Sequence, residues 1–217
     1  YARQDRKTRG REPITAKLVA NLLTTAGVDR VLTVDLHSGQ IQGFFDIPVD
    51  HLTAIPILAD YLKTRDLSNC VVVSPDAGSI PRARDMAERL NLPVAFVDKR
   101  RPEPNKSEVM NVVGKVQGHK AILLDDIIDT GGSLLQAAKA LRHLGATSVM
   151  ACATHPVFSG KAKANMEEAG FEELIVTNTI PIDDALQPLV RVLSVASMLG
   201  DAIVRIHEGH SVSQMFR

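Results

Sequence analysis

Short apolar runs and amphipathic stretches alternate along the chain, and polar turns separate them. Runs rich in Val, Ile and Leu predict strands at residues 30–36, 70–74, 93–98, 112–116, 121–124, 148–154, 174–177 and 190–195. Apolar residues at helical spacing predict helices at residues 14–26, 56–64, 81–90, 134–144, 161–169 and 196–208. This alternation predicts an α/β fold in which a mainly parallel sheet is covered by helices on both faces.

The most informative stretch is AILLDDIIDTGGS at residues 121–133, where an apolar strand ends in acidic residues and glycines before a helix. The consecutive carboxylates of Asp125 and Asp126 can accept hydrogen bonds from ribose hydroxyls or hold Mg²⁺ through water. The glycine turn that follows offers hydroxyls and backbone N–H groups to a phosphate at a helix N-terminus. The residues of this turn are Asp129, Thr130, Gly131, Gly132 and Ser133.

This turn matches neither the P-loop pattern nor the G-x-G-x-x-G dinucleotide pattern. The alternative is a purely structural turn that uses Asp129 and Ser133 alone as caps. Four apolar residues followed by DDIIDTGGS are much more specific than a capping box. The stretch therefore favours a site for a phosphorylated ribose.

Further candidates follow the other predicted strands, at the edge where open α/β sheets bind ligands. His37 follows the strand at 30–36, and a lone histidine there is more often structural. Its neighbours Asp35 and Gly39 nevertheless make a metal-linked role credible. Asp76 begins an Asp-Ala-Gly-Ser turn before a helix, a pattern that can present backbone N–H groups to phosphate but is weak evidence by itself.

Two segments are locally basic. Residues 1–12 (YARQDRKTRGRE) form either a solvated arm or an anion-binding loop, because Arg and Lys both bind phosphates. Residues 99–105 (KRRPEPN) contain two prolines and little apolar content, which predicts a loop. That loop is either a plain surface segment or a lid that carries cations over a phosphate.

The composition places the chain among ordinary globular proteins, with 45% hydrophobic and 23% charged residues. Lys+Arg and Asp+Glu both number 25, so no overall basic field favours nucleic acid or an anionic membrane. Cys70 and Cys152 lie in apolar runs, which predicts two buried thiols in a reducing, cytoplasmic compartment. We see no run of the roughly 20 apolar residues that a membrane span needs, and no secretory signal. The chain starts at Tyr1 within a polar stretch, so we expect a piece without its natural N-terminus.

Several motifs in the same order resemble one family, the bacterial ribose-phosphate diphosphokinases (phosphoribosyl pyrophosphate synthetases). Residues 122–133 also resemble the phosphoribosyl-pyrophosphate motif of type I phosphoribosyltransferases. The resemblance to the diphosphokinases covers essentially all 217 residues. Its motifs are YARQDRK at 1–7, REPITAKLVANLL at 11–23, VLTVDLHSGQIQGFF at 31–45, VVVSPD at 71–76, VDKRRPEPN at 97–105, ATHPVFSG at 153–160 and SVSQMF at 211–216.

The resemblance implies a type I phosphoribosyltransferase-like fold with one nearly complete domain and the end of a preceding similar domain. Residues 1–50 would end the N-terminal domain, residues 51–205 would form the C-terminal domain, and residues 206–217 would pack back toward the first. The family transfers the diphosphoryl group of ATP to the anomeric hydroxyl of ribose 5-phosphate, giving phosphoribosyl diphosphate and AMP for nucleotide biosynthesis. It uses Mg²⁺ and assembles as hexamers built from dimers.

The resemblance also implies a role for each matching residue. Arg3 and Gln4 would contact ATP, and His37 and Asp76 would be metal-linked. Lys99 would be catalytic, and Arg101 would be catalytic and contact ribose 5-phosphate. The ribose 5-phosphate site would consist of Asp125, which holds the ribose, and of Asp129, Thr130, Gly131, Gly132 and Ser133, which hold the phosphate. We nominate no general base.

The chain departs from the family pattern in three places. The family's N-terminal Phe-x-Asp-Gly-Glu stretch, which supplies part of the ATP site from a neighbouring subunit, is not in this sequence. The usual D-x-G-G turn reads Asp-Ala-Gly-Ser here, so Ser79 would be strained if the second glycine needed positive φ. Ser133 replaces a more usual threonine and keeps its hydroxyl.

Three other functions compete with the diphosphokinase. A salvage phosphoribosyltransferase would share residues 122–133 but would not need the Arg-Gln pair, the DLHS turn or the KRRPEP segment. A non-catalytic regulatory homologue would be expected to have lost Lys99, Arg101, His37 or Asp76, all of which are present. An inactive piece of the enzyme, lacking part of the ATP site, is the third.

Overall fold

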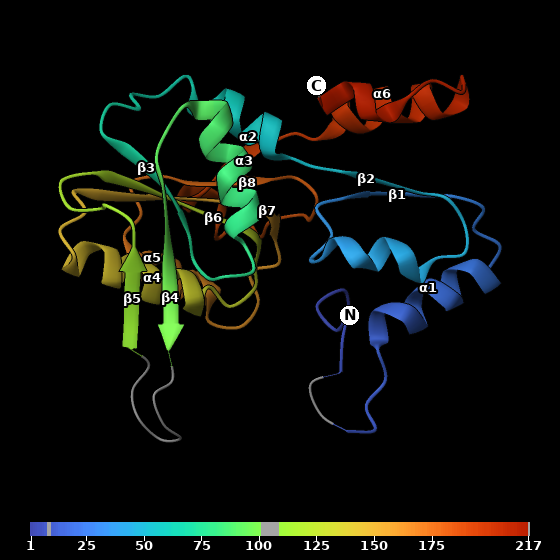
Figure 1. The fold of residues 1–217 in the computed structure, drawn as a ribbon, viewed down its shortest axis with the longest axis horizontal. Coiled ribbons are helices and arrows are strands. Elements are labelled where there is room, and N and C mark those ends of the chain that lie inside the picture. The colour runs from blue at the N-terminus through green and yellow to red at the C-terminus, as the bar shows by residue number, and fades with distance from the viewer. Residues whose placement is uncertain (8–9, 101–108, 217) are drawn as a thin grey trace. The chain divides into compact units, whose positions relative to one another are not determined.

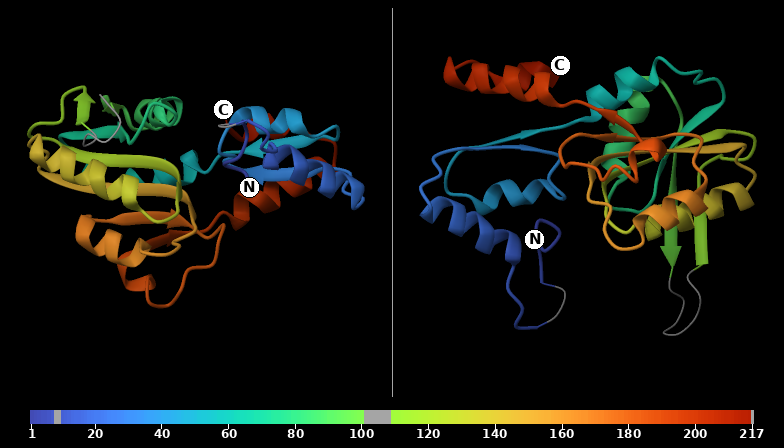
Figure 2. Two further views of the ribbon diagram at one scale, coloured as in Figure 1. Left: turned by 90° about the horizontal axis from the view of Figure 1, so that it is seen from below. Right: turned by 180° about the vertical axis from the view of Figure 1, so that it is seen from behind.

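The computed structural model of the chain describes residues 1–7, 10–100 and 109–216 and forms two compact units (Figures 1 and 2). The first unit comprises Tyr1–Ala54 together with Arg205–Arg217, and the second comprises Ile55–Val204. Helix α6 (Ala196–His207) contains the point of division. We describe each unit by itself.

The first unit is built around a pair of parallel strands. Its elements are α1 (Thr15–Thr25), β1 (Val31–Val34), the 3₁₀ helix η1 (Gly39–Phe44), β2 (Val49–Leu52) and the 3₁₀ helix η3 (Val212–Phe216). β1 and β2 pair in parallel, with Val31 opposite Val49 and Val34 opposite Leu52. The sequence did not predict β2, because its residues VDHL are half polar and follow a glycine- and phenylalanine-containing loop.

The second unit contains a seven-stranded sheet. Its strands are β3 (Cys70–Ser74), β4 (Val94–Arg100), β5 (Val109–Val113), β6 (Lys120–Ile128), β7 (Ser148–Pro156), β8 (Leu174–Thr177) and β9 (Arg191–Leu193). Their spatial order is β5-β4-β3-β6-β7-β8-β9, and only the β4–β5 pair is antiparallel. A short 3₁₀ helix, η2 (Gln187–Leu189), precedes β9.

Helices cover both faces of this sheet. The helices of the second unit before α6 are α2 (Ile55–Leu62), α3 (Ile80–Leu90), α4 (Gly132–His143) and α5 (Ala162–Ala169). Apolar residues of α2 and α3 pack with one set of alternating strand positions, including Ile122 and Leu124. Residues of α4 and α5 pack with the other set, including Leu123. The predicted α/β architecture is thus confirmed, and Figure 2 shows helices on both sides of the sheet.

The strand order reverses between β3 and β6. From β3 the chain passes through α3 to β4 on one side, and from β6 it passes through α4 and α5 to β7 and β8 on the other. β3 and β6 are themselves neighbours and parallel, with Cys70 opposite Lys120 and Val73 opposite Leu123. Such a reversal opens a crevice at the carboxyl ends of the strands, where α/β sheets bind ligands.

Two predictions about this sheet need correction at their boundaries. β4 continues beyond Asp98, so Lys99 lies in a strand opposite Met110 rather than in a loop. β5 begins at Val109, three residues before the predicted strand. Both differences have one cause: the two strands pair with each other, and this pairing extends them past the residues that local composition favours. The two cysteines are buried and unbridged, as predicted.

Candidate functional site

Three carboxylates gather at the reversal between β3 and β6. Asp76 lies two residues after Ser74, the last residue of β3. Asp125 and Asp126 lie in the C-terminal half of strand β6. The turn at Asp76 is fixed locally, since the Ser74 hydroxyl donates to the Asp76 backbone oxygen at 2.6 Å. The Asp76 carboxylate in turn accepts the Ser79 N–H at 3.0 Å.

Ser79 adopts φ −89° and ψ 0°. The condition under which a side chain at this position would be strained is therefore not met, because the turn does not use positive φ here. Ser79 precedes the first residue of α3, and Pro81 occupies the first turn of that helix, where a missing N–H costs nothing. The Asp-Ala-Gly-Ser turn is a relaxed entry into α3.

Asp125 has a pKa well above the usual value of a carboxyl group. Burial, followed by the hydrogen bond and charge of Asp126 and by the charge of Asp76, raises the pKa of Asp125 to about 7. The Asp126 N–H and the Ser79 hydroxyl both donate to Asp125 Oδ1, at 2.9 and 3.3 Å. A carboxyl held in this way can switch between accepting and donating hydrogen bonds near neutral pH.

Asp126 is buried, and it pairs with a cation. Arg82 Nη1 lies 3.7 Å from Asp126 Oδ1, and the two side chains are 17% and 6% exposed. A buried carboxylate is costly without such a partner. Because Arg82 belongs to the first turn of α3, the pair fixes that helix against β6. Asp125 is therefore the carboxylate of the pair that remains for a ligand.

The predicted phosphate turn leads directly into α4. Gly131 is the N-cap of this helix, and its φ of +74° is a conformation that glycine adopts without strain. A Cβ at Gly131 would lie 2.2 Å from Met166 Cε, so the end of the Met166 side chain would have to move to admit a side chain there. Thr130 and Ser133 are exposed. The turn thus presents hydroxyls and the first N–H groups of a twelve-residue helix to one side, as an anion site requires.

The segment after β7 supports this turn from outside the motif. The Phe158 N–H donates to the Ile128 oxygen at 2.9 Å, and the Ser159 N–H donates to the Asp129 oxygen at 3.0 Å. The Ser159 hydroxyl also donates to the Asp129 carboxylate. Asp129 is therefore held by a neighbouring loop.

Asn165 on α5 provides a further support. Its Nδ2 donates to the Thr130 backbone oxygen at 2.8 Å, and the next residue, Met166, fills the space beside Gly131. Sequence reasoning missed Ser159 and Asn165. Their partners lie 30 and 35 residues away, so no local pattern could have identified them.

The first unit holds the residues predicted to contact ATP. Gln4 is tied to the start of α1, because its backbone oxygen accepts the Ala16 N–H at 3.1 Å and its side-chain oxygen accepts the Thr15 hydroxyl. Arg3 and His37 are exposed. Gln4 therefore has a structural role in addition to any contact with a ligand.

Asp5 joins this segment to the turn that carries His37. Asp5 Oδ2 accepts the Ser38 hydroxyl at 2.7 Å and Gln40 Nε2 at 3.0 Å. The hydrogen bond from Ser38, with smaller contributions from the charges of His37 and Arg6, lowers the pKa of Asp5. Sequence reasoning missed Asp5 and Ser38, which are 33 residues apart.

The turn before His37 is shaped by a buried carboxylate. Asp35 has φ +42°, and its side chain accepts the Thr53 hydroxyl and the Ala54 N–H, both at 2.9 Å. The Leu36 N–H donates to His51 Nε2 at 2.9 Å. The end of β2 thus fixes the path of the chain into His37, which explains how an unpredicted strand positions a predicted residue.

Lys99 is described only as a residue of β4, and Arg101 lies outside the described residues. His37 belongs to the first unit and Asp76 to the second. Among the described residues, no group of three or more His, Cys, Asp or Glu side chains could hold a metal ion. Mg²⁺ commonly uses one or two carboxylates plus water and substrate phosphates, so the Asp76 carboxylate fits that ion without a larger cluster.

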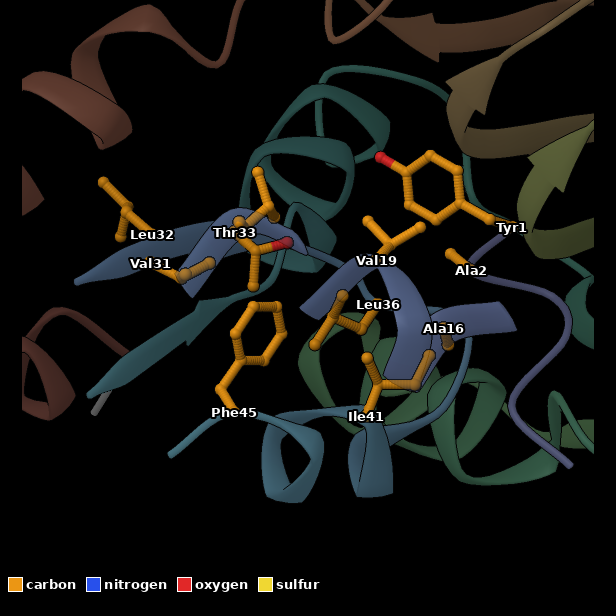
Figure 3. Close-up of a pocket in the computed structure, with 11 residues that line it drawn as sticks. Tyr1, Ala2, Ala16, Val19, Val31, Leu32, Thr33, Leu36, Ile41 and Phe45 are labelled. Carbon is orange, nitrogen blue, oxygen red and sulfur yellow. The ribbon is translucent and has the colours of Figure 1, made fainter. Parts of the chain in front are cut away.

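A cavity in the first unit has a different chemistry. It measures about 170 Å³ and lies between α1, β1 and η1 (Figure 3). Its lining is apolar apart from the hydroxyls of Tyr1 and Thr33, as Figure 3 shows. Such a lining offers no counter-charge to a phosphate.

In the described residues no helix combines the length and apolar character that crossing a membrane requires.

Two family models match the chain. The N-terminal domain of ribose phosphate pyrophosphokinase matches residues 1–27, and the phosphoribosyl synthetase-associated domain matches residues 99–217. The second match includes the strand β6, the phosphate turn and the supporting residues of α5.

Individual relatives match the chain from end to end. It is 57% identical over 217 residues to the ribose-phosphate pyrophosphokinase of Bacillus cereus, covering 100% of this chain and 68% of that relative. It is 58% identical over 218 residues to ribose-phosphate pyrophosphokinase 1 of Listeria monocytogenes, covering 69% of that relative. The crystal structure of phosphoribosylpyrophosphate synthetase from Mycobacterium smegmatis matches with a TM-score of 0.90 at 47% identity, covering 96% of this chain and 69% of that one.

Proposed function

We propose that this chain, which belongs to the ribose-phosphate pyrophosphokinase family, transfers the diphosphoryl group of ATP to the anomeric hydroxyl of ribose 5-phosphate. The products are phosphoribosyl diphosphate, a precursor in nucleotide biosynthesis, and AMP. One observation supports the proposal: the Asp125 carboxylate and the glycine turn before α4 lie at the two ends of one short segment, residues 125–133, at the reversal of the sheet.

The acceptor side of the reaction follows from this geometry. The turn Asp129 to Ser133 would hold the 5-phosphate through helix N–H groups and hydroxyls. Asp125 would accept hydrogen bonds from the ribose hydroxyls and so fix the sugar. Holding the sugar at both ends makes its anomeric hydroxyl a positioned nucleophile, which is the main contribution a protein makes to phosphoryl transfer.

The donor side rests on residues assigned by family pattern. Arg3 and Gln4 would contact ATP, and their segment is ordered by the hydrogen bonds of Gln4 and Asp5. Lys99 and Arg101 would offset the negative charge that develops as AMP departs. We also propose a division of the chain. Residues 1–50 would be the end of an N-terminal phosphoribosyltransferase-like domain, residues 51–205 would be the C-terminal domain, and residues 206–217 would be a C-terminal tail.

Mg²⁺ is the metal that we propose for the reaction. His37 and Asp76 would be the metal-linked residues, and the ion would neutralise charge on the transferring phosphates. One Asp76 oxygen already accepts the Ser79 N–H, so the turn holds the carboxylate in a fixed orientation. We further propose that the enzyme is cytoplasmic and assembles as hexamers built from dimers. We propose no nucleic acid or membrane as its partner.

The proposal is tested by following AMP and phosphoribosyl diphosphate from ATP and ribose 5-phosphate in the presence of Mg²⁺. We would assay the chain itself and a chimaera that adds the part of the Bacillus cereus relative that the chain does not match. Lys99→Ala in the active form should lower turnover by orders of magnitude while largely sparing ribose 5-phosphate binding. If neither form makes AMP and neither binds ribose 5-phosphate, the proposed function is wrong.

A non-catalytic regulatory homologue is the alternative, and the same assay separates it from the enzyme. Such a protein would bind ribose 5-phosphate but form no AMP even in the chimaera. The presence of Lys99, Arg101, His37 and Asp76 in the sequence favours the enzyme.

A further inference from the structure

Ser79 connects two parts of the site at the sheet reversal, the turn at Asp76 and the carboxylate of Asp125. Its N–H donates to Asp76 Oδ1 at 3.0 Å, and its φ of −89° requires no glycine. The side chain is partly buried, and its hydroxyl is directed to Asp125 Oδ1 at 3.3 Å. One residue therefore joins the turn after β3 to the ligand-facing carboxylate of β6.

Two hydrogen-bond donors reach the same oxygen of Asp125. The Asp126 N–H donates to Oδ1 at 2.9 Å, and the Ser79 hydroxyl donates to it at 3.3 Å. A carboxylate oxygen has two lone pairs, so these donors together occupy Oδ1 and set the rotation of the carboxyl group. The other oxygen, Oδ2, is then the one that meets a ligand in a defined direction.

We propose that Ser79 is a positioning residue of the ribose 5-phosphate site, which fixes the Asp125 carboxylate and thereby favours a phosphorylated sugar over phosphate alone. The inference rests on the proposed function, because it takes Asp125 as the residue that meets the sugar. Ser79 does not reach the phosphate turn, whose supports come from the loop after β7 and from α5. Loss of its hydroxyl should therefore affect the sugar and spare the phosphate.

The hydroxyl–carboxylate distance of 3.3 Å is long for such a pair, which commonly measures under 3.0 Å. Hydrogen bonds of this kind are often long before the ligand is bound and shorten in the complex. A contact that shortens when the sugar binds strengthens the bound state more than the empty one, which is the condition for a contribution to affinity.

The test compares dissociation constants for ribose 5-phosphate and inorganic phosphate, measured by titration calorimetry on the whole chain. Ser79→Ala keeps the backbone N–H that caps Asp76 and removes only the hydroxyl. We expect its affinity for ribose 5-phosphate to fall about five-fold, the usual effect of one hydrogen bond, while its affinity for phosphate is unchanged. Ser79→Thr restores the hydroxyl and should restore the sugar affinity. Ser148→Ala, the same substitution outside the site, should change neither constant.

Each other outcome overturns the inference. Equal affinity of Ser79→Ala and the parent chain for ribose 5-phosphate would show that the hydroxyl does not position Asp125. An equal loss for sugar and phosphate would show that Ser79 maintains the general structure of the site. If the parent chain binds phosphate but gains nothing from the ribose, the proposed function fails as well, and that result is seen before any variant is made.

Discussion

At the scale of single residues, the site is built from groups that are individually unfavourable. Asp125 is a carboxyl placed among two other carboxylates and partly removed from water. Asp35 holds a positive φ that few residues other than glycine adopt. Such features persist where the surrounding structure determines them strongly, and they concentrate at functional sites. Replacing the Asp125 carboxylate by a neutral group should therefore raise the stability of the chain at a pH where that carboxylate is ionised.

The clearest case is the dependence of stability on the ionisation of Asp125. Its pKa is raised from 3.8 to about 7, so between these values the native state holds a proton that the unfolded state has released. This group therefore makes the free energy of unfolding increase as pH falls through 7, and the gain is complete below the unfolded value. One pKa unit corresponds to about 1.4 kcal/mol, so the raised pKa can change the free energy of unfolding by at most about 4 kcal/mol. Because Asp125 is partly exposed, we expect a change of about 1–2 kcal/mol.

The measurement compares the parent chain with Asp125→Asn in urea denaturation at pH 8 and pH 5, without metal. Asn has the same shape and no charge, so the variant should be more stable than the parent at pH 8, and this difference should fall to less than half at pH 5, because it disappears only below the unfolded pKa of 3.8. Other titrating groups cancel in the difference between the two proteins. A difference that does not depend on pH would contradict the raised pKa of Asp125.

Ser148 offers a second prediction at this scale, away from the site. Among the described residues its hydroxyl is the buried side-chain polar atom that has no hydrogen-bond partner. Leaving such a group unpaired costs about 1–3 kcal/mol, so Ser148→Ala should stabilise the chain by about 1 kcal/mol. The urea midpoint should rise with an unchanged slope. Thr147→Ala, at the neighbouring exposed position, is the control and should change stability by less than about 0.5 kcal/mol. A lower midpoint for Ser148→Ala would refute the prediction.

At the scale of elements, the sequence predicted most helices and strands because their apolar periodicity is strong. β3 and β8 have the predicted bounds, and α5 and α6 differ from prediction by one residue. The elements that were missed or misplaced, β2 and the β4–β5 pair, are defined by pairing with another strand rather than by their own composition. The same division applies to the site. Residues 125–133 were predicted from a continuous motif, whereas Asp5, Ser159 and Asn165 act only through long-range contacts that no local pattern reveals.

The supporting role of α5 leads to a prediction for Asn165. Asn165→Ala removes the hydrogen bond to the Thr130 backbone oxygen, so the phosphate turn loses one constraint. Because the turn holds the phosphate common to both ligands, affinity for ribose 5-phosphate and for inorganic phosphate should fall by the same factor, about five-fold. Titration calorimetry with both ligands measures this.

The control for this prediction lies on the same helix. Glu167→Ala changes an exposed residue of α5 and should leave both dissociation constants unchanged. An effect of Asn165→Ala on the sugar alone, the pattern expected of Ser79→Ala, would contradict the assignment of α5 to the phosphate turn. The two variants together therefore separate the two ends of the ligand.

At the scale of the whole molecule, the sequence sufficed to predict the family, and the relatives confirm it. The type I phosphoribosyltransferase-like architecture of a mainly parallel sheet is likewise confirmed. The expected division into residues 1–50, 51–205 and 206–217 came from the family resemblance alone, since contiguous motifs by themselves say nothing of which segments pack together. The N-terminal residues 1–54 and the C-terminal residues 205–217, at opposite ends of the sequence, belong to the same unit.

This division predicts that the two substrates act on different parts of the chain. Ribose 5-phosphate should slow amide exchange at residues 76–79, 125–133 and 158–166, all in the second unit, and ATP should slow it at residues 3–5 and 37–40 in the first. A ligand at 100 times its dissociation constant stabilises the bound state by about 2.7 kcal/mol, so exchange through opening of the site should slow about hundred-fold. Hydrogen–deuterium exchange with mass spectrometry measures this peptide by peptide, and inorganic phosphate serves as the control that should protect only residues 129–133 and 158–166. Equal protection of both units by ribose 5-phosphate would contradict the assignment of its site to residues 125–133.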